Sequence, residues 1–249
     1  MAIAFVHGNP ETAAIWQPLL TAMNRNDTVT LSPPGFGAPL LDEFEPTSDS
    51  YVHWLVGELE KFDEPVDLVG HDWGGGHVMR AVIARPDLVN RWCIDIAGCF
   101  DPDYTWHDMA LLWQKEAEGE AVVAMMSEGP IDQRTDGFIT LGMTPEAARS
   151  CAEAAATPEM RRSILGLYRS AIQPRMTEFG NQMLPVMSAG RSLVLIAAED
   201  TYTGGEVLAR RTAQRWGSEV AVLKGLGHWW MMQDPERSAA ALNRFFNAS

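Results

Sequence analysis

One carboxylate stands in a setting that suits a nucleophile. The stretch VGHDWGGG, residues 69–76, places Asp72 among small residues, with an apolar run before it and a helical pattern after it. This pattern predicts a sharp turn from a strand into a helix, where small neighbours permit a strained backbone. A carboxylate is ionised near pH 7 and can displace a leaving group from saturated carbon, which leaves an alkyl ester on Asp72.

Hydrolysis of such an ester needs a general base and donors for an oxyanion. His228 lies in GLGHWW, directly after an apolar run, and Asp200 follows the run SLVLIAAE. We expect Asp200 to fix the tautomer of His228, and His228 to activate water. The backbone amides of Asn9 and Trp73 are the expected oxyanion donors. Three other acids lie near the alternative position after the preceding strand: Asp95, Asp101 and Asp103.

The elements that must hold these residues alternate along the chain. Short apolar runs predict strands at 2–6, 28–31, 66–70, 92–97, 192–197 and 219–223. Amphipathic runs predict helices at 11–24, 48–62, 73–85, 204–216 and 235–247. This alternation is typical of an α/β fold, with a mostly parallel sheet of about six strands and helices on both faces. Loops at the carboxyl edge of that sheet would bring the candidate residues together.

Residues 100–188 interrupt the alternation. They show no good strand pattern, are rich in helix formers, and are divided by glycine and proline at several points. An insertion of about 90 residues is far longer than a usual connection, and such insertions are commonly functional. We expect a core domain made of residues 1–99 and 189–249, with residues 100–188 as a helical lid over an apolar pocket.

The bulk composition limits the partners. The 249 residues carry a net charge of −14, which disfavours nucleic acid and anionic membranes as partners. No apolar run approaches the ~20 residues of a membrane span, and the N-terminus lacks the features of a signal peptide. The three cysteines show no metal-ligand spacing. We expect a cytoplasmic protein with reduced thiols, no metal and no cofactor, acting on a small apolar organic substrate.

These motifs, in this order, resemble the α/β-hydrolase superfamily over nearly the whole chain, and within it the branch with an Asp nucleophile. HGNPETAAIW and GHWWMMQDPE are similar to segments of epoxide hydrolases, and GHDWGG is shared by epoxide hydrolases and haloalkane dehalogenases. The resemblance implies the chain order nucleophile, acid, histidine, which Asp72, Asp200 and His228 follow. LGLYRSA resembles the lid segment that carries an epoxide-polarising tyrosine, which implies that role for Tyr168.

The leaving group distinguishes the two activities of this branch. An epoxide oxygen leaves as an alkoxide and needs a proton donor such as Tyr168. A halide needs only N–H donors, and Asn9 with Trp73 resembles the halide-binding pair of many haloalkane dehalogenases. We expect an epoxide hydrolase, with a haloalkane dehalogenase or a non-catalytic ligand-binding protein as the alternatives.

Two features depart from the pattern of the superfamily. The second lid tyrosine of epoxide hydrolases has no counterpart in MALLWQ, residues 109–114, and three residues are candidates to replace it: Tyr104, Trp106 and His107. The usual hairpin before the first strand is also missing, and a bare sheet edge invites pairing, so a homodimer is one expectation. We expect His7 and His71, which flank the site in sequence, to support the backbone and not to take part in the chemistry.

Overall fold

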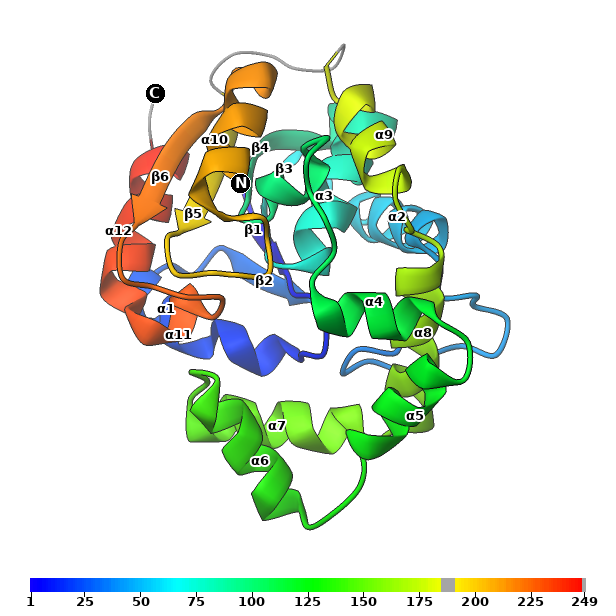
Figure 1. The fold of residues 1–249 in the computed structure, drawn as a ribbon. Helices are drawn as coiled ribbons and strands as arrows, with labels where there is room; N and C mark the ends of the chain where they lie inside the picture. Colours follow the sequence, from blue (N-terminus) through cyan, green and yellow to red (C-terminus); the bar gives the residue numbers. More distant parts are fainter. Residues whose placement is uncertain (185–190, 248–249) are drawn as a thin grey trace.

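The computed structural model describes residues 1–184 and 191–247, and a parallel sheet lies at its centre (Figure 1). The strands are β1 Ile3–Val6, β2 Thr28–Leu31, β3 Val66–Gly70, β4 Val89–Ile94, β5 Ser192–Ala197 and β6 Glu219–Leu223. They are hydrogen-bonded in the order β2-β1-β3-β4-β5-β6, and every pair is parallel. The predicted six-stranded α/β fold is therefore confirmed.

Helices cover both faces of the sheet. One face carries α2 Ser48–Leu59, α3 Trp73–Ala84 and α10 Gly205–Trp216, and the other carries η1 Ala13–Trp16, α1 Gln17–Met23, α11 Trp230–Gln233 and α12 Pro235–Phe246. Neighbouring residues of a strand point to opposite faces, so each strand serves both cores. In β1, Ala4 and Val6 pack on the α3 side, whereas Ile3 and Phe5 pack on the α1 side.

Two predicted elements have different bounds in the structure. The sequence predicts the fourth strand at 92–97, whereas β4 spans Val89–Ile94, because the pairing with β3 begins at Val89 and the chain leaves the sheet at Asp95. Short helices flank this strand: η2 Pro86–Leu88 and η3 Ala97–Phe100. The first predicted helix, 11–24, begins only at Ala13, because the Thr12 side chain caps it and Glu11 is fully buried.

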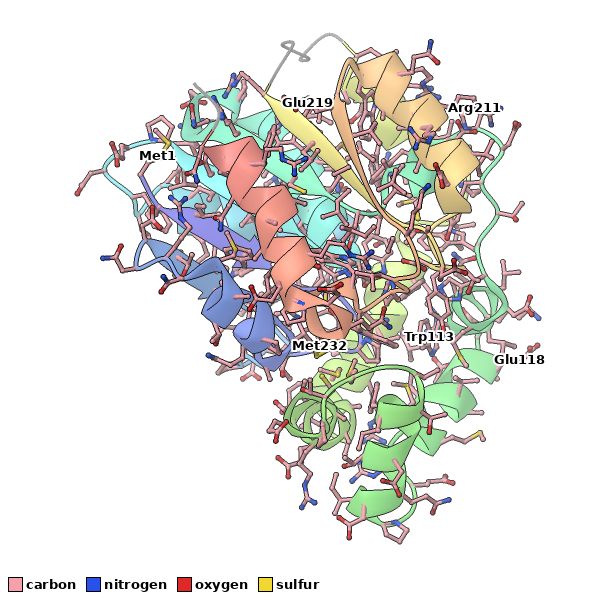
Figure 2. The ribbon with its side chains drawn as sticks, turned by 90° about the vertical axis from the view of Figure 1, so that its left-hand side faces the viewer. Met1, Trp113, Glu118, Arg211, Glu219 and Met232 are labelled. Carbon is pink, nitrogen blue, oxygen red and sulfur yellow. The ribbon has the colours of Figure 1, made fainter. Side chains whose placement is uncertain are left out.

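The segment between η3 and β5 is helical, as predicted. Its described helices are α4 Asp108–Gln114, α5 Glu118–Met125, α6 Ile131–Thr140, α7 Pro145–Ala155, α8 Pro158–Arg169 and α9 Arg175–Gln182. Both views place α6 and α7 beyond the carboxyl ends of the strands (Figures 1 and 2). In contrast, α9 packs on the core, with the Arg80 guanidinium 4.0 Å from the centre of the Phe179 ring. The predicted boundary between residues 188 and 189 lies outside the described residues.

None of the described helices has the length and apolar character needed to cross a membrane.

Candidate active site

Asp72 occupies the turn between β3 and α3. Its backbone has a φ of 48° and a ψ of −130°, which L-residues rarely adopt and which stores strain at the turn. Close packing of α3 on the sheet requires glycine, since a Cβ on Gly74 would lie 2.1 Å from the carbonyl oxygen of Val6. The turn presents the carboxylate at the carboxyl edge of the sheet, where the sequence predicts it.

Backbone amides hold one oxygen of this carboxylate. The Asn9 N–H donates to Asp72 Oδ1 at 2.8 Å, and the backbone amide of Trp73 also donates to the carboxylate. Gly8 allows this contact, because a Cβ there would lie 2.1 Å from Oδ1 and 2.6 Å from the Trp73 nitrogen. Oδ2 accepts no hydrogen bond from the described residues and lies 4.0 Å from His228 Nε2.

The loops after β5 and β6 supply an acid and a histidine. His228 Nδ1 lies 2.8 Å from Asp200 Oδ2, and the backbone amide of Tyr202 donates to Asp200 Oδ1 at 2.8 Å. The second nitrogen of the ring, Nε2, is left to face Asp72. The structure therefore brings together Asp72, Asp200 and His228. Two alternative acids, Asp101 and Asp103, pair instead with the Arg211 guanidinium.

Burial and pairing set the charges of these groups. Burial raises the pKa of Asp72 to about 6, although the positive charge of His228 opposes the rise. Burial would lower the pKa of His228, but the charge and hydrogen bond of Asp200 together with the Asp72 charge outweigh it and hold the pKa above its usual 6.5. Burial would raise the pKa of Asp200, but His228 outweighs it and lowers the pKa below 3.8. Both carboxylates are therefore largely ionised at neutral pH.

A second histidine, His71, lies in the interior beside His228. The His71 ring is centred 4.6 Å from that of His228, and both of its nitrogens contact buried carboxylates. Nε2 lies 3.0 Å from Glu11 Oε1, and Nδ1 lies 2.5 Å from Asp95 Oδ2. Burial would lower the pKa of His71, but the two carboxylates outweigh it and raise the pKa well above 6.5. The ring is therefore a buried cation, as a histidine that donates twice must be.

The same two carboxylates fix the backbone of the site. Asp95 Oδ1 accepts the Asp72 amide at 3.1 Å, and Glu11 Oε2 accepts the Gly8 amide at 2.9 Å. Each carboxylate also accepts an indole N–H, from Trp229 to Glu11 at 2.6 Å and from Trp230 to Asp95 at 2.7 Å. This buried network, defined by Glu11, His71 and Asp95, holds the turn at Asp72 and the loop after β1 in a fixed relative position.

One group in the described part of the chain has the spacing of metal ligands. Glu11, His71 and His228 each offer an atom within 4.8 Å of the others. A metal needs a lone pair from each ligand, but both nitrogens of His71 donate to carboxylates. His228 Nδ1 is likewise bonded to Asp200. The chemistry of this donor set fits a proton better than a metal ion.

Tyr168 contacts Asn9 and Trp73, the two residues whose amides reach the carboxylate. Its buried hydroxyl accepts a hydrogen bond from Asn9 Nδ2 at 3.4 Å, and its ring packs edge-on against Trp73, 5.3 Å between centres. Burial raises the pKa of Tyr168 well above 10, although hydrogen bonds from Asn9 and Trp73 oppose the rise. The group therefore keeps its proton at neutral pH.

The structure separates the three candidates for the second proton donor. Tyr104 Oη and Trp106 Nε1 already donate to backbone carbonyl oxygens, at 2.9 and 3.2 Å. His107 Nδ1 accepts the Ala110 amide at 3.3 Å, so the proton of the neutral ring sits on Nε2. Burial lowers the pKa of His107 to about 4, which keeps the ring neutral. Of these three side chains, only His107 has an N–H or O–H that donates to no acceptor among the described residues.

A cavity of about 650 Å³ opens over the carboxylate, between the sheet edge and the helices α4 to α6. Asp72, Tyr168 and His228 line its inner end, and its remaining wall is mostly apolar, with Trp113 and Met126 among the lining residues. A site of this size and polarity suits an apolar small molecule.

Comparison with known proteins agrees with this geometry. Residues 3–241 match the alpha/beta hydrolase family. The chain belongs to this family. It is 33% identical over 97 residues to an epoxide hydrolase of Caballeronia sordidicola, a match that spans 34% of this chain and only 28% of that protein.

Solved structures of other alpha/beta hydrolases share the fold. The epoxide hydrolase CorEH has a TM-score of 0.80 at 15% identity, covering 98% of this chain and 90% of its own. A variant of the haloalkane dehalogenase DatA from Agrobacterium tumefaciens C58 has a TM-score of 0.79 at 17% identity, covering 99% and 90%. A variant of a meta-cleavage product hydrolase from Pseudomonas fluorescens IP01 has a TM-score of 0.74 at 18% identity, covering 99% and 90%.

Sequence reasoning missed some residues of this alpha/beta hydrolase site. Glu11 was visible only as part of the HGNPE segment, and Asp95 only as an alternative acid. Tyr202 lines the cavity, with its ring centred 5.1 Å from that of His228. Its position two residues after Asp200 was the one available signal. His71 does support the backbone, as expected, but through two carboxylates that lie far away in sequence.

Proposed function

We propose that this protein is a hydrolase that opens an epoxide through an alkyl ester on Asp72. The observation that carries the proposal is the unequal setting of the two carboxylate oxygens. Oδ1 accepts the Asn9 amide, whereas Oδ2 lies 4.0 Å from His228 Nε2 in a residue that lines the cavity. Such an arrangement suits a carboxylate that attacks with one oxygen and later bears an oxyanion on the other.

In the first step, Asp72 Oδ2 attacks one ring carbon and the carbon–oxygen bond of the epoxide breaks. The departing alkoxide takes the proton of Tyr168, and the His107 Nε2–H donates a second hydrogen bond to it. The product is an ester whose carbonyl oxygen is Oδ1. The raised pKa of Tyr168 suits a donor that must remain protonated until the alkoxide forms.

In the second step, His228 Nε2 takes a proton from water, and the hydroxide attacks the Asp72 carbonyl carbon. Negative charge develops on Oδ1, where the amides of Asn9 and Trp73 already donate. Collapse of this intermediate breaks the bond between the Asp72 carbonyl carbon and Oδ2 and releases a diol, and the His228 proton goes to the leaving oxygen. The second proton of the attacking water remains on the new Asp72 carboxyl group and passes to the Tyr168 phenolate, which restores both groups. Helices α4 to α8 act in this scheme as a lid that excludes bulk water.

A haloalkane dehalogenase would use the same nucleophile and base. Asn9 Nδ2 favours this alternative, because it lies at the cavity wall where a halide could accept its hydrogen bond. The epoxide is preferred because Tyr168 and His107 both line the cavity and each offers a proton, which a halide leaving group does not need.

Trapping the ester tests the proposal. The variant His228→Ala should form the ester but fail to hydrolyse it, so an incubated epoxide such as styrene oxide should add its mass to the peptide containing Asp72. Parallel incubation with a bromoalkane reports on the alternative, and Asp72→Asn in the His228→Ala background is the matched control. An adduct from the bromoalkane alone would favour the dehalogenase. A lack of any adduct from both reagents, with tight binding of either, would favour a non-catalytic protein.

A further inference from the structure

Two cavities of very different size meet at the nucleophile. Besides the large cavity, a pocket of about 10 Å³ lies beside Asp72 on the side of η3 and α9. Asp72, His107 and Tyr202 line both spaces, so they form the partition between them. A substrate carbon in contact with Asp72 therefore has ample room on one side and almost none on the other.

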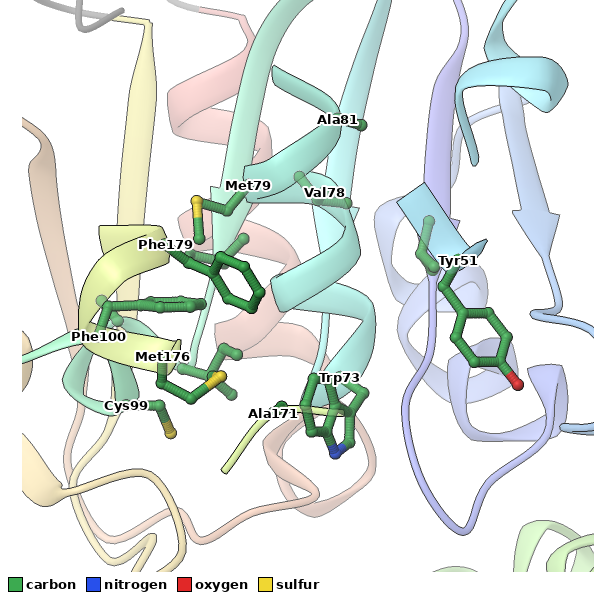
Figure 3. Close-up of a cluster of buried hydrophobic side chains, with 14 of the residues drawn as sticks. Tyr51, Trp73, Val78, Met79, Ala81, Cys99, Phe100, Ala171, Met176 and Phe179 are labelled. Atoms are coloured by element: carbon green, nitrogen blue, oxygen red, sulfur yellow. The ribbon is translucent and has the colours of Figure 1, made fainter. Parts of the chain in front are cut away.

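Ring stacking and a hydrogen bond fix part of the wall of the small pocket. Trp73 and Trp106 stack with their rings 5.8 Å apart, and the Tyr104 hydroxyl is tied to the Tyr202 carbonyl at 2.9 Å. Met176 and Cys99, both buried, form the wall toward the core, and Figure 3 labels them in the same buried cluster as Trp73. A space of this size holds about one water molecule. It can accept a hydrogen atom or a methyl group, but no longer chain.

The large cavity has the opposite character. Its charged groups are Asp72 and His228 at the inner end, and the remaining wall is mostly aliphatic, aromatic and methionine side chains. Three of the lining side chains are also exposed to solvent: Met109 by 42%, Met125 by 67% and Leu141 by 51%. Exposed apolar side chains at a cavity mouth are typical of a binding surface that an apolar ligand covers.

We infer that the substrate carries its epoxide at the end of an apolar chain, with the chain in the large cavity and at most a methyl group in the small pocket. This inference rests on the proposed function and names its substrate class. Methionine side chains suit such a chain because they adapt to many shapes.

Isomers of equal size test the inference on the unmodified enzyme. The terminal epoxide of decane should be hydrolysed with a kcat/KM at least about tenfold higher than the mid-chain 5,6-epoxide, because a misplaced alkyl group in a fixed pocket costs that much or more. The 2,3-epoxide, which needs room for one methyl group, should lie between them. Equal kcat/KM values for the terminal and mid-chain isomers would overturn the inference.

A pair of matched variants locates the effect. Met176→Ala enlarges the small pocket and should narrow the ratio between the isomers, whereas Val207→Ala, at an exposed position of α10 that lines neither cavity, should leave the ratio unchanged. Because Met176 is only 1% exposed and its loss leaves a cavity, thermal unfolding must confirm that the variant is folded. Ile96→Val, which removes one methylene from the same pocket, replaces it if Met176→Ala does not fold. An unchanged ratio in the folded variant would contradict the inference.

The size inference and the proposed function fail in different ways. If no epoxide is hydrolysed but bromoalkanes are, the proposed function is wrong, and 1-bromodecane against 5-bromodecane tests the pocket in the same manner. If both epoxide isomers are hydrolysed at equal rates, the function stands and the inference is wrong.

Discussion

At the scale of single residues, the charges of the site change in a useful direction during the proposed reaction. The Asp72 carboxylate helps to raise the pKa of His228 in the free protein. Formation of the ester removes that negative charge, which makes the imidazolium less favourable. His228 therefore becomes a better-populated neutral base at the step that needs one.

The second donor can be tested apart from hydrolysis. In the His228→Ala background, the rate at which an epoxide adds its mass to Asp72 reports on ring opening alone. We expect His107→Phe to slow this step by about tenfold or more, and His107→Gln, which keeps an N–H donor, to slow it less. Tyr168→Phe should give the largest loss. An undiminished rate in His107→Phe would assign the second hydrogen bond to another group.

At the scale of elements, the turn after β3 and the loop after β1 act as one unit. The strained backbone of Asp72 persists because α3 packs against the sheet through Gly74, and the Asn9 amide reaches Oδ1 because Gly8 has no Cβ. Local signals encode these features, which is why the sequence predicts the turn and the strands around it.

Gly8→Ala should remove activity without preventing folding. The added methyl would lie within 2.1 Å of Asp72 Oδ1 and must push the loop away, which displaces the Asn9 amide from the oxygen. We expect kcat to fall by about 100-fold or more, the usual cost of losing an oxyanion donor. Gly57→Ala is the control, because a Cβ there meets nothing within 4 Å. Steady-state kinetics with circular dichroism separates lost activity from lost structure.

The helical segment between η3 and β5 has features that the local sequence predicts and contacts that it does not. Its helical character is visible from composition and from Thr-Pro starts at Thr144 and Thr157, both of which cap helices in the structure. Which of Tyr104, Trp106 and His107 keeps a free proton depends on backbone partners more than sixty residues away in two cases. Sequence spacing cannot identify such partners, so the choice of donor needed the structure.

At the scale of the whole molecule, the buried network joins loops from four different strands. Glu11 follows β1, His71 follows β3, Asp95 follows β4, and the two tryptophans follow β6. None of these pairings could be inferred from a strand pattern, although each residue lies beside a recognisable motif. The network makes the geometry of the site depend on four of the six strands.

Glu11→Gln should destabilise the protein by about 3 kcal/mol at neutral pH, because it leaves a buried cation with one carboxylate. Glu153→Gln makes the same chemical change in an exposed pair with Arg149 and should cost much less, because solvent screens the pair. Urea unfolding of the three proteins measures the difference. A loss in Glu11→Gln no larger than in Glu153→Gln would show that the network contributes little to stability.

The pH dependence of that difference has a definite sign. Burial would raise the pKa of Glu11, but His71 outweighs it and lowers the pKa from 4.5 to about 2. A carboxylate with a depressed pKa stabilises the fold fully above its unfolded pKa, and this contribution is lost as the pH falls through the folded value. The gap between the native protein and Glu11→Gln should therefore narrow between about pH 4.5 and pH 2.

The apolar cavity also favours substrate binding over product binding. A cavity of about 650 Å³ with few polar groups favours apolar solutes over polar ones, because binding removes apolar surface from water. An epoxide with an apolar chain would bind in such a cavity, whereas the corresponding diol carries two hydroxyl groups whose burial without partners costs free energy. If the protein acts on epoxides as proposed, the cavity should retain the substrate better than the product, and accumulating diol should compete only weakly for the site.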